Sequence, residues 1–127
     1  SELMEVTDRY AMKGERSGRP DFSSLLSYGN EASMLDKLTT ETEKEMQALR
    51  DAKCRNDLEG LNALTHHLRS SWEILRADQS LKVLYRLLHG EGTPDNEALF
   101  HAVNGVLEKG AEIIRLAKEE RRKYGQG

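Results

Sequence analysis

Apolar residues recur at helical spacing along most of the chain. Between residues 31 and 52 they stand mostly three or four positions apart, with charged residues between them, which is typical of a helix with one face in a core. A second apolar line follows Asp57, an N-cap type of residue. It consists of Leu58, Leu61, Thr65, Leu68, Trp72 and Leu75. Its alternating steps of three and four positions predict a helix that presents one seam to a bundle.

Two more helices are expected downstream. One has Asp78 as its N-cap and ends near Gly90. Its apolar line consists of Leu81, Leu84, Leu87 and Leu88. The other helix should have Thr93 as its N-cap and Pro94 in the first helical position, where the missing N–H has no intrahelical partner. It should run to about Tyr124.

The remaining residues complete the expected architecture. Residues 1–20 are polar and interrupted by glycine and proline, so we expect a linker or tail, with a short helix around residues 3–12. Asp21 or Ser23 should cap a short helical turn. Because no segment has the pattern of a strand, we predict an all-α fold. Residues 21–125 should form an antiparallel up-and-down four-helix bundle, preceded by the extra N-terminal helix or tail.

Charge and composition disfavour several classes of function. The chain has 22 acidic and 19 basic residues and a formal net charge of −3, whereas nucleic-acid-binding domains usually carry a basic patch. No apolar run approaches the roughly 20 residues that span a bilayer. The single cysteine, Cys54, excludes an internal disulfide. We therefore expect a cytoplasmic domain, or the cytoplasmic end of a membrane-anchored protein, with no nucleic-acid or direct membrane contact.

The candidate chemistry lies in the four histidines, His66, His67, His89 and His101. Adjacent histidines on one helix point about 100° apart and cannot chelate one metal ion together, so we expect no metal site. No glycine-rich phosphate loop or kinase motif is present, so we expect no nucleotide site and no cofactor of the chain's own. His89 and His101 are expected to have structural or surface roles.

His66 is the best-placed nucleophile. It falls about 130° from the centre of the apolar seam and should face solvent. Four polar residues should share its face, namely Asn62, Arg69, Ser70 and Glu73. A neutral imidazole is a nucleophile, Arg69 could offset the charge of a phosphoryl group, and the small Ser70 leaves room for a partner. An ordinary solvated helix face has the same composition. The position of His66 alone therefore fits both a phosphoryl acceptor and an ordinary surface histidine.

The residues around His66 resemble the motif of histidine-containing phosphotransfer (HPt) domains. In that family a histidine is followed by any residue, an aliphatic residue, lysine, glycine, and serine or alanine, and later by an aliphatic residue near a Gly-Ala pair. Here the motif residues are His66, Leu68, Arg69, Ser70, Ser71, Leu75 and Ala77. The likeness covers about residues 21–120, although only the stretch around His66 is specific.

The sequence departs from the family pattern at three positions. Arg69 replaces the usual lysine, which keeps the charge but changes its geometry. Ser70 replaces the usual glycine, and Arg76 stands where the family often has a second glycine. The family places the acceptor three residues before the basic residue, which selects His66; His67 is the alternative acceptor.

The resemblance implies a phosphocarrier of two-component phosphorelays. Such domains accept a phosphoryl group from the aspartyl phosphate of one receiver domain and return it to another receiver, and the receiver supplies the magnesium ion. The receiver-docking face around the acceptor would consist of Asn62, His67, Arg69, Ser70 and Glu73. A stand-alone protein and a domain of a hybrid sensor histidine kinase both fit this pattern. Two alternatives stay open: a degenerate adaptor that binds signalling partners without being phosphorylated, and a helical bundle with no phosphate chemistry.

Overall fold

The computed structural model describes residues 20–90, 92 and 94–124. Within these ranges the chain is all-helical, as predicted, and has no strand. The helices are α2 (Ser23–Leu26), α3 (Glu31–Arg55), α4 (Leu58–Ile74), α5 (Gln79–Leu88) and α6 (Asn96–Arg122). The short helix expected around residues 3–12 lies outside the described residues. No helix among those described is both long enough and apolar enough to cross a membrane.

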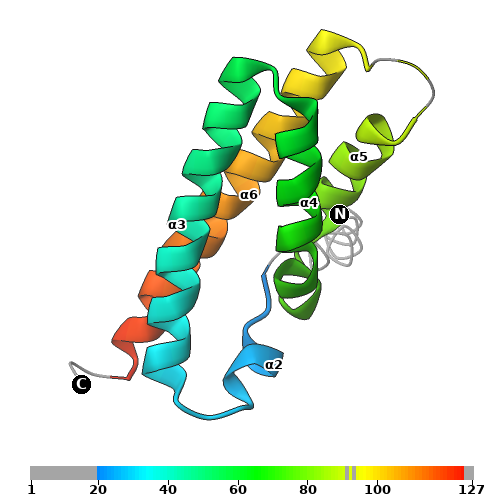
Figure 1. The fold of residues 1–127 in the computed structure, drawn as a ribbon. Helices are drawn as coiled ribbons and strands as arrows, with labels where there is room; N and C mark the ends of the chain where they lie inside the picture. Colours follow the sequence, from blue (N-terminus) through cyan, green and yellow to red (C-terminus); the bar gives the residue numbers. More distant parts are fainter. Residues whose placement is uncertain (1–19, 91, 93, 125–127) are drawn as a thin grey trace, which may run out of the picture.

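Helices α3 to α6 form an antiparallel bundle (Figure 1). Each helix packs against the next one along the chain, and α6 returns to close the bundle against α3 in its most extensive interface. The two long helices, α3 and α6, reach beyond the shorter α4 and α5, and α2 lies near the end that they share. The predicted up-and-down four-helix arrangement is therefore confirmed, and α2 lies where a short helical turn was expected after Asp21.

The core follows the apolar lines of the sequence. Along the seam of α4, Leu61, Leu68 and Trp72 are buried, while Leu58 at its start is half-buried. Thr65 occupies the same seam and is also buried, with its hydroxyl donating a hydrogen bond to the Leu61 carbonyl at 2.8 Å. A hydroxyl that bonds to the preceding helical turn can enter a core without an unsatisfied polar group.

The helix boundaries agree with the expected ones at α4 but not at α6. Asp57 caps α4, and its carboxylate accepts a hydrogen bond from the Gly60 amide at 2.9 Å. The prediction that Pro94 opens the last helix is wrong, because the helix begins at Asn96 and Asp95 is its N-cap. The Asp95 carboxylate accepts a hydrogen bond from the Ala98 amide at 3.0 Å. A charged acceptor suits the positive end of a helix dipole, and Pro94 precedes the cap.

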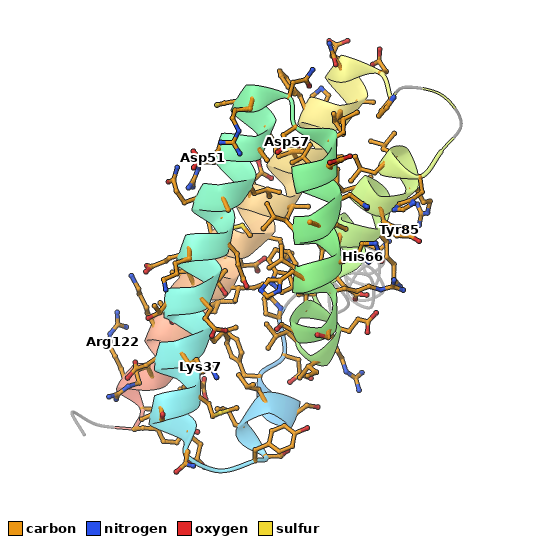
Figure 2. All side chains as sticks on the ribbon, viewed as in Figure 1. Lys37, Asp51, Asp57, His66, Tyr85 and Arg122 are labelled. Carbon is orange, nitrogen blue, oxygen red and sulfur yellow. The ribbon has the colours of Figure 1, made fainter. Side chains whose placement is uncertain are left out.

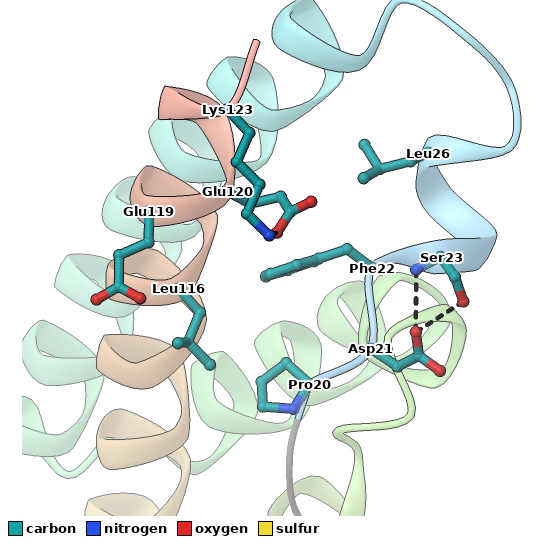
Figure 3. Close-up of a pocket in the computed structure, with 9 residues that line it drawn as sticks. All are labelled: Pro20, Asp21, Phe22, Ser23, Leu26, Leu116, Glu119, Glu120 and Lys123. Carbon is teal, nitrogen blue, oxygen red and sulfur yellow. Dashed lines mark hydrogen bonds and ion pairs between the residues drawn. The ribbon is translucent and has the colours of Figure 1, made fainter.

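The segment before α2 is fastened to the end of α4. The Asp21 amide donates to the Leu75 carbonyl at 2.7 Å, and the Asp21 carboxylate accepts bonds from the Ser23 hydroxyl and amide at 2.7 and 3.0 Å. These bonds from Ser23 hold the pKa of Asp21 below its usual value. Phe22 points toward α6 across a hollow of about 610 Å³ (Figure 3).

Candidate functional site

His66 lies midway along α4, on the side that faces α5. It is exposed, as its helical position predicts. Its ring meets the rings of Tyr85 and His89 edge-on, with centroid separations of 5.7 and 5.9 Å. Figure 2 shows His66 and Tyr85 on neighbouring helices, side by side. The imidazole therefore rests against an aromatic surface on one side while it stays accessible to solvent.

The aromatic surface is a stacked pair that is itself anchored to α4. The rings of Tyr85 and His89 are 4.1 Å apart and inclined by 28°. His89 Nε2 is 2.8 Å from the Asn62 side-chain oxygen, and the ring nitrogen is the donor because an amide oxygen only accepts. Asn62 therefore contributes to the site through His89, and not only as a neighbour of His66 on the helix face.

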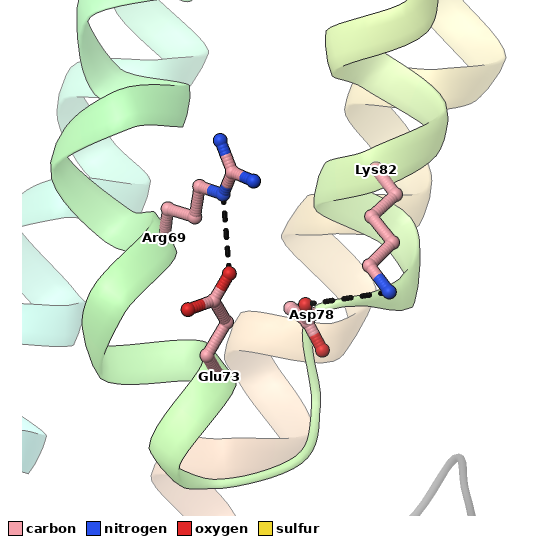
Figure 4. Close-up of polar contacts among 4 residues, drawn as sticks. All are labelled: Arg69, Glu73, Asp78 and Lys82. Carbon is pink, nitrogen blue, oxygen red and sulfur yellow. Dashed lines mark hydrogen bonds and ion pairs between the residues drawn. The ribbon is translucent and has the colours of Figure 1, made fainter.

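Cationic side chains surround the histidine. The Arg69 guanidinium lies 5.6 Å from the centre of the Tyr85 ring, and its Nε is 3.1 Å from a Glu73 carboxylate oxygen. On α5, Lys82 Nζ is 3.8 Å from a carboxylate oxygen of Asp78. Figure 4 shows these two ion pairs, each between residues four positions apart in the sequence. Both cations are about half exposed, so such pairs add little stability.

His67 faces the opposite neighbour of α4. Its Nε2 is 2.7 Å from a carboxylate oxygen of Glu45 on α3. Burial raises the pKa of the Glu45 carboxyl, an effect that the attraction of His67 partly offsets. His66 and His67 are adjacent in sequence, but one contacts α5 and the other pairs with α3. They do not form one cluster.

The other residues of the predicted docking face, Ser70 and Glu73, are exposed on α4. A hollow of about 300 Å³ opens between α4 and α5. Its lining consists of Thr65, His66, Arg69, Asp78, Leu81, Lys82, Tyr85 and Arg86. Of the residues predicted to share the site, His66 and Arg69 therefore border this hollow, whereas Ser70 and Glu73 are not part of its wall.

Sequence reasoning missed the contribution of α5. The sequence pattern predicted only a structural or surface role for His89 and no role at the site for Lys82, Tyr85 and Arg86. Their spacing contained a signal, because Lys82, Tyr85, Arg86 and His89 recur at intervals of three and four and so share one helix face. The short connection between α4 and α5 makes these helices antiparallel neighbours. Which face of α5 turns toward His66 emerges only from the packed bundle.

Within the described residues, no group of three or more His, Cys, Asp or Glu side chains is arranged to hold a metal ion. Comparison with protein-family models, with curated proteins and with solved structures found no match.

Proposed function

We propose that this chain is a histidine phosphotransfer domain that carries a phosphoryl group on His66 between receiver domains. The observation that carries the proposal is the placement of an exposed imidazole at mid-helix, beside a cation one turn away and against a neighbouring aromatic pair. A nucleophile on a rigid helix is well suited to in-line phosphoryl transfer, which depends mainly on positioning and charge neutralisation.

The proposed reaction needs little from the chain beyond this nucleophile. A neutral ring nitrogen of His66 attacks the phosphorus of an aspartyl phosphate on the receiver, the P–O bond to the aspartate breaks, and the carboxylate leaves. The ring loses its N–H proton to solvent. The reverse reaction passes the group to a second receiver. Arg69 offsets the charge of the phosphoryl oxygens, and the magnesium ion is expected on the receiver.

The surroundings of the two histidines favour His66 over His67 as the acceptor. His67 is paired with a half-buried carboxylate at 2.7 Å, and a phosphoryl group there would meet the negative charge of Glu45. His66 has cations and aromatic rings around it instead. The same assignment follows from the resemblance, in which the acceptor precedes the basic residue by three positions.

The backbone at Arg76 supports the resemblance at a position where the sequence departs from it. Arg76 has a φ of 57°, in the left-handed region that glycine adopts without a steric penalty. The family often has glycine at this position. The turn at Arg76 therefore keeps the backbone conformation expected for glycine, although the residue is arginine. This difference from the family pattern affects the turn after α4 and not the surroundings of His66.

Transfer from a phosphorylated receiver tests the proposal. Wild type, His66→Gln and His67→Gln are each mixed with a panel of phosphorylated receivers, and acid-labile phosphate on the chain is measured. We expect transfer to wild type and to His67→Gln but not to His66→Gln. Loss only in His67→Gln would reverse the acceptor assignment. No transfer to wild type from any receiver would overturn the phosphocarrier proposal in favour of a non-phosphorylated adaptor that binds signalling partners.

A further inference from the structure

The hollow between α4 and α5 has an uneven charge. Three cationic residues line it, Arg69, Lys82 and Arg86, against one carboxylate, Asp78. Two of the cations come from α5, outside the segment that resembles the phosphotransfer motif. Since His66 lines the same hollow, an anion inside it would lie beside the imidazole.

The cations differ in how they are held. Arg69 pairs with Glu73 on α4, and Lys82 pairs with Asp78, the N-cap residue of α5; both cations are about half exposed, whereas Asp78 is mostly buried. Arg86 has no ion-pair partner within the described part of the chain and is exposed. Because exposed pairs are weak, a dianion that accepts hydrogen bonds from several cations can replace the carboxylates. Charge-assisted bonds to phosphate oxygens are stronger than ordinary hydrogen bonds.

We propose that this hollow is a phosphoryl-binding site of the chain's own, in which Lys82 and Arg86 hold a phosphoryl group against His66, so that His66 accepts it directly from a small phosphodonor such as phosphoramidate. The proposal rests on the assignment of His66 as the acceptor but needs no receiver. The volume of about 300 Å³ accommodates a small phosphorylated molecule and leaves no space for a protein domain.

The chemistry of this step balances without a further reactant. A ring nitrogen of His66 attacks the phosphorus of phosphoramidate, whose nitrogen already carries three protons at neutral pH, the P–N bond breaks, and neutral ammonia leaves with the bonding electron pair. The ring N–H proton passes to solvent. Lys82 and Arg86 bind the non-bridging oxygens, and Arg69 approaches the same group from α4. Holding the donor beside the nucleophile replaces a bimolecular encounter with reaction inside a bound pair.

The chain contains its own reference groups for the test. His101 on α6 and His67 are both exposed, so chemical phosphorylation by phosphoramidate reaches them without help from the hollow. The full chain is treated with potassium phosphoramidate, and the phosphorylation rate at each histidine is followed by mass spectrometry at neutral pH. We expect His66 to react on the order of tenfold faster than His101. Equal rates at the two histidines would overturn the proposal.

Charge removal then tests the role of α5. The double variant Lys82→Gln/Arg86→Gln should lose most of the advantage of His66 while the rate at His101 stays unchanged. Arg115→Gln/Lys118→Gln on α6 removes the same net charge from residues paired with Glu119 and Glu43, and should leave the His66 rate as in wild type. All four positions are exposed, so the fold is retained. An unchanged His66 rate in the α5 variant would refute the role of Lys82 and Arg86.

Orthophosphate separates binding from reaction. Added to the unphosphorylated chain, it should shift the NMR signals of the Lys82 and Arg86 side chains and slow the phosphoramidate reaction at His66 but not at His101. Absence of both effects would overturn the binding site. If no receiver transfers a phosphoryl group to the chain but His66 reacts faster than His101 with phosphoramidate, receivers are not the partner and the phosphoryl-binding site in the hollow stands. If receivers transfer a phosphoryl group to His66 but phosphoramidate reacts at equal rates with His66 and His101, the phosphoryl-binding site in the hollow is refuted and the phosphocarrier function stands.

Discussion

The rings of Tyr85 on α5 and of His89, the C-cap residue of α5, stack 4.1 Å apart, and both meet the ring of His66 on α4 edge-on. Edge-to-face contacts between rings are favourable by about 0.5–1.5 kcal/mol each. Such contacts restrict the orientations open to an exposed side chain that would otherwise rotate freely. The stacked pair therefore positions the imidazole that we propose as the phosphoryl acceptor.

Removing the Tyr85 ring should slow transfer to His66. In Tyr85→Ala the imidazole loses one of its two edge-on partners, and we expect a loss on the order of tenfold in the transfer rate because the nucleophile is less well oriented. Tyr85→Phe keeps the ring and should restore the rate to near wild type. Stopped-flow measurement with a phosphorylated receiver compares the three proteins. Equal losses in both variants would assign the effect to the hydroxyl group and contradict positioning by the ring.

A large side chain at position 70 should block the approach of a receiver. Ser70 is exposed on α4, one turn after His66, so Ser70→Leu adds bulk beside the acceptor without entering the core. We expect the transfer rate to fall on the order of a hundredfold, since a displacement of about 1 Å is enough for such a loss. Ser33→Leu, at an exposed position on α3, is the matched control. An unchanged rate in Ser70→Leu would show that receivers do not dock over this face.

The periodic seam of α4 explains why the fold was predictable from the sequence. Trp72 and Leu68 recur at bundle spacing and are buried, and Asp57 before them is the N-cap. These features depend on residues within one or two helical turns of each other. The position of His66 outside the seam follows from the same periodicity, which is why its exposure could be predicted.

The surroundings of His66 depend on contacts between distant residues. His89 bonds to Asn62 across 27 positions of the sequence, and the partner of His67 is Glu45 on another helix. Periodicity assigns a residue to a helix face but does not say which face meets which neighbour. At the start of α6, the sequence pattern predicted Thr93 as the N-cap and Pro94 as the first helical residue, whereas Asp95 is the N-cap. Several residue types that favour a helix start follow one another here, and the sequence pattern does not choose among them.

Two glycines of α6 should respond oppositely to alanine. A methyl group at Gly105 would meet only Ser80 Cβ, at 3.9 Å, whereas one at Gly110 would lie well inside van der Waals contact of the buried Met46 side chain. We expect Gly105→Ala to stabilise the fold by up to about 1 kcal/mol through helix propensity. Gly110→Ala should instead cost about 1–3 kcal/mol through overpacking. Urea unfolding measures both.

A second substitution identifies the cause of the Gly110 effect. The atoms nearest to a methyl group at Gly110 would all belong to the Met46 side chain. Met46→Ala should therefore remove most of the penalty of Gly110→Ala, giving a coupling energy of about 1 kcal/mol or more in a double-mutant cycle. Additive effects of the two substitutions would rule out a clash between these residues.

Glu45 should make stability depend on pH. Burial raises the pKa of its carboxyl, Glu41 adds to the rise, and the attraction and hydrogen bond of His67 oppose it. Because the folded pKa lies above the unfolded one, stability is lost as pH rises through the interval between them. His67→Gln keeps a polar side chain but no charge, so we expect a still higher pKa for Glu45, measured by NMR titration of its carboxyl carbon. That variant should then lose more stability than wild type as the pH rises from the ordinary pKa of a glutamate carboxyl through the raised folded pKa of Glu45. An equal or lower pKa in His67→Gln would mean that the 2.7 Å contact does not stabilise the Glu45 carboxylate.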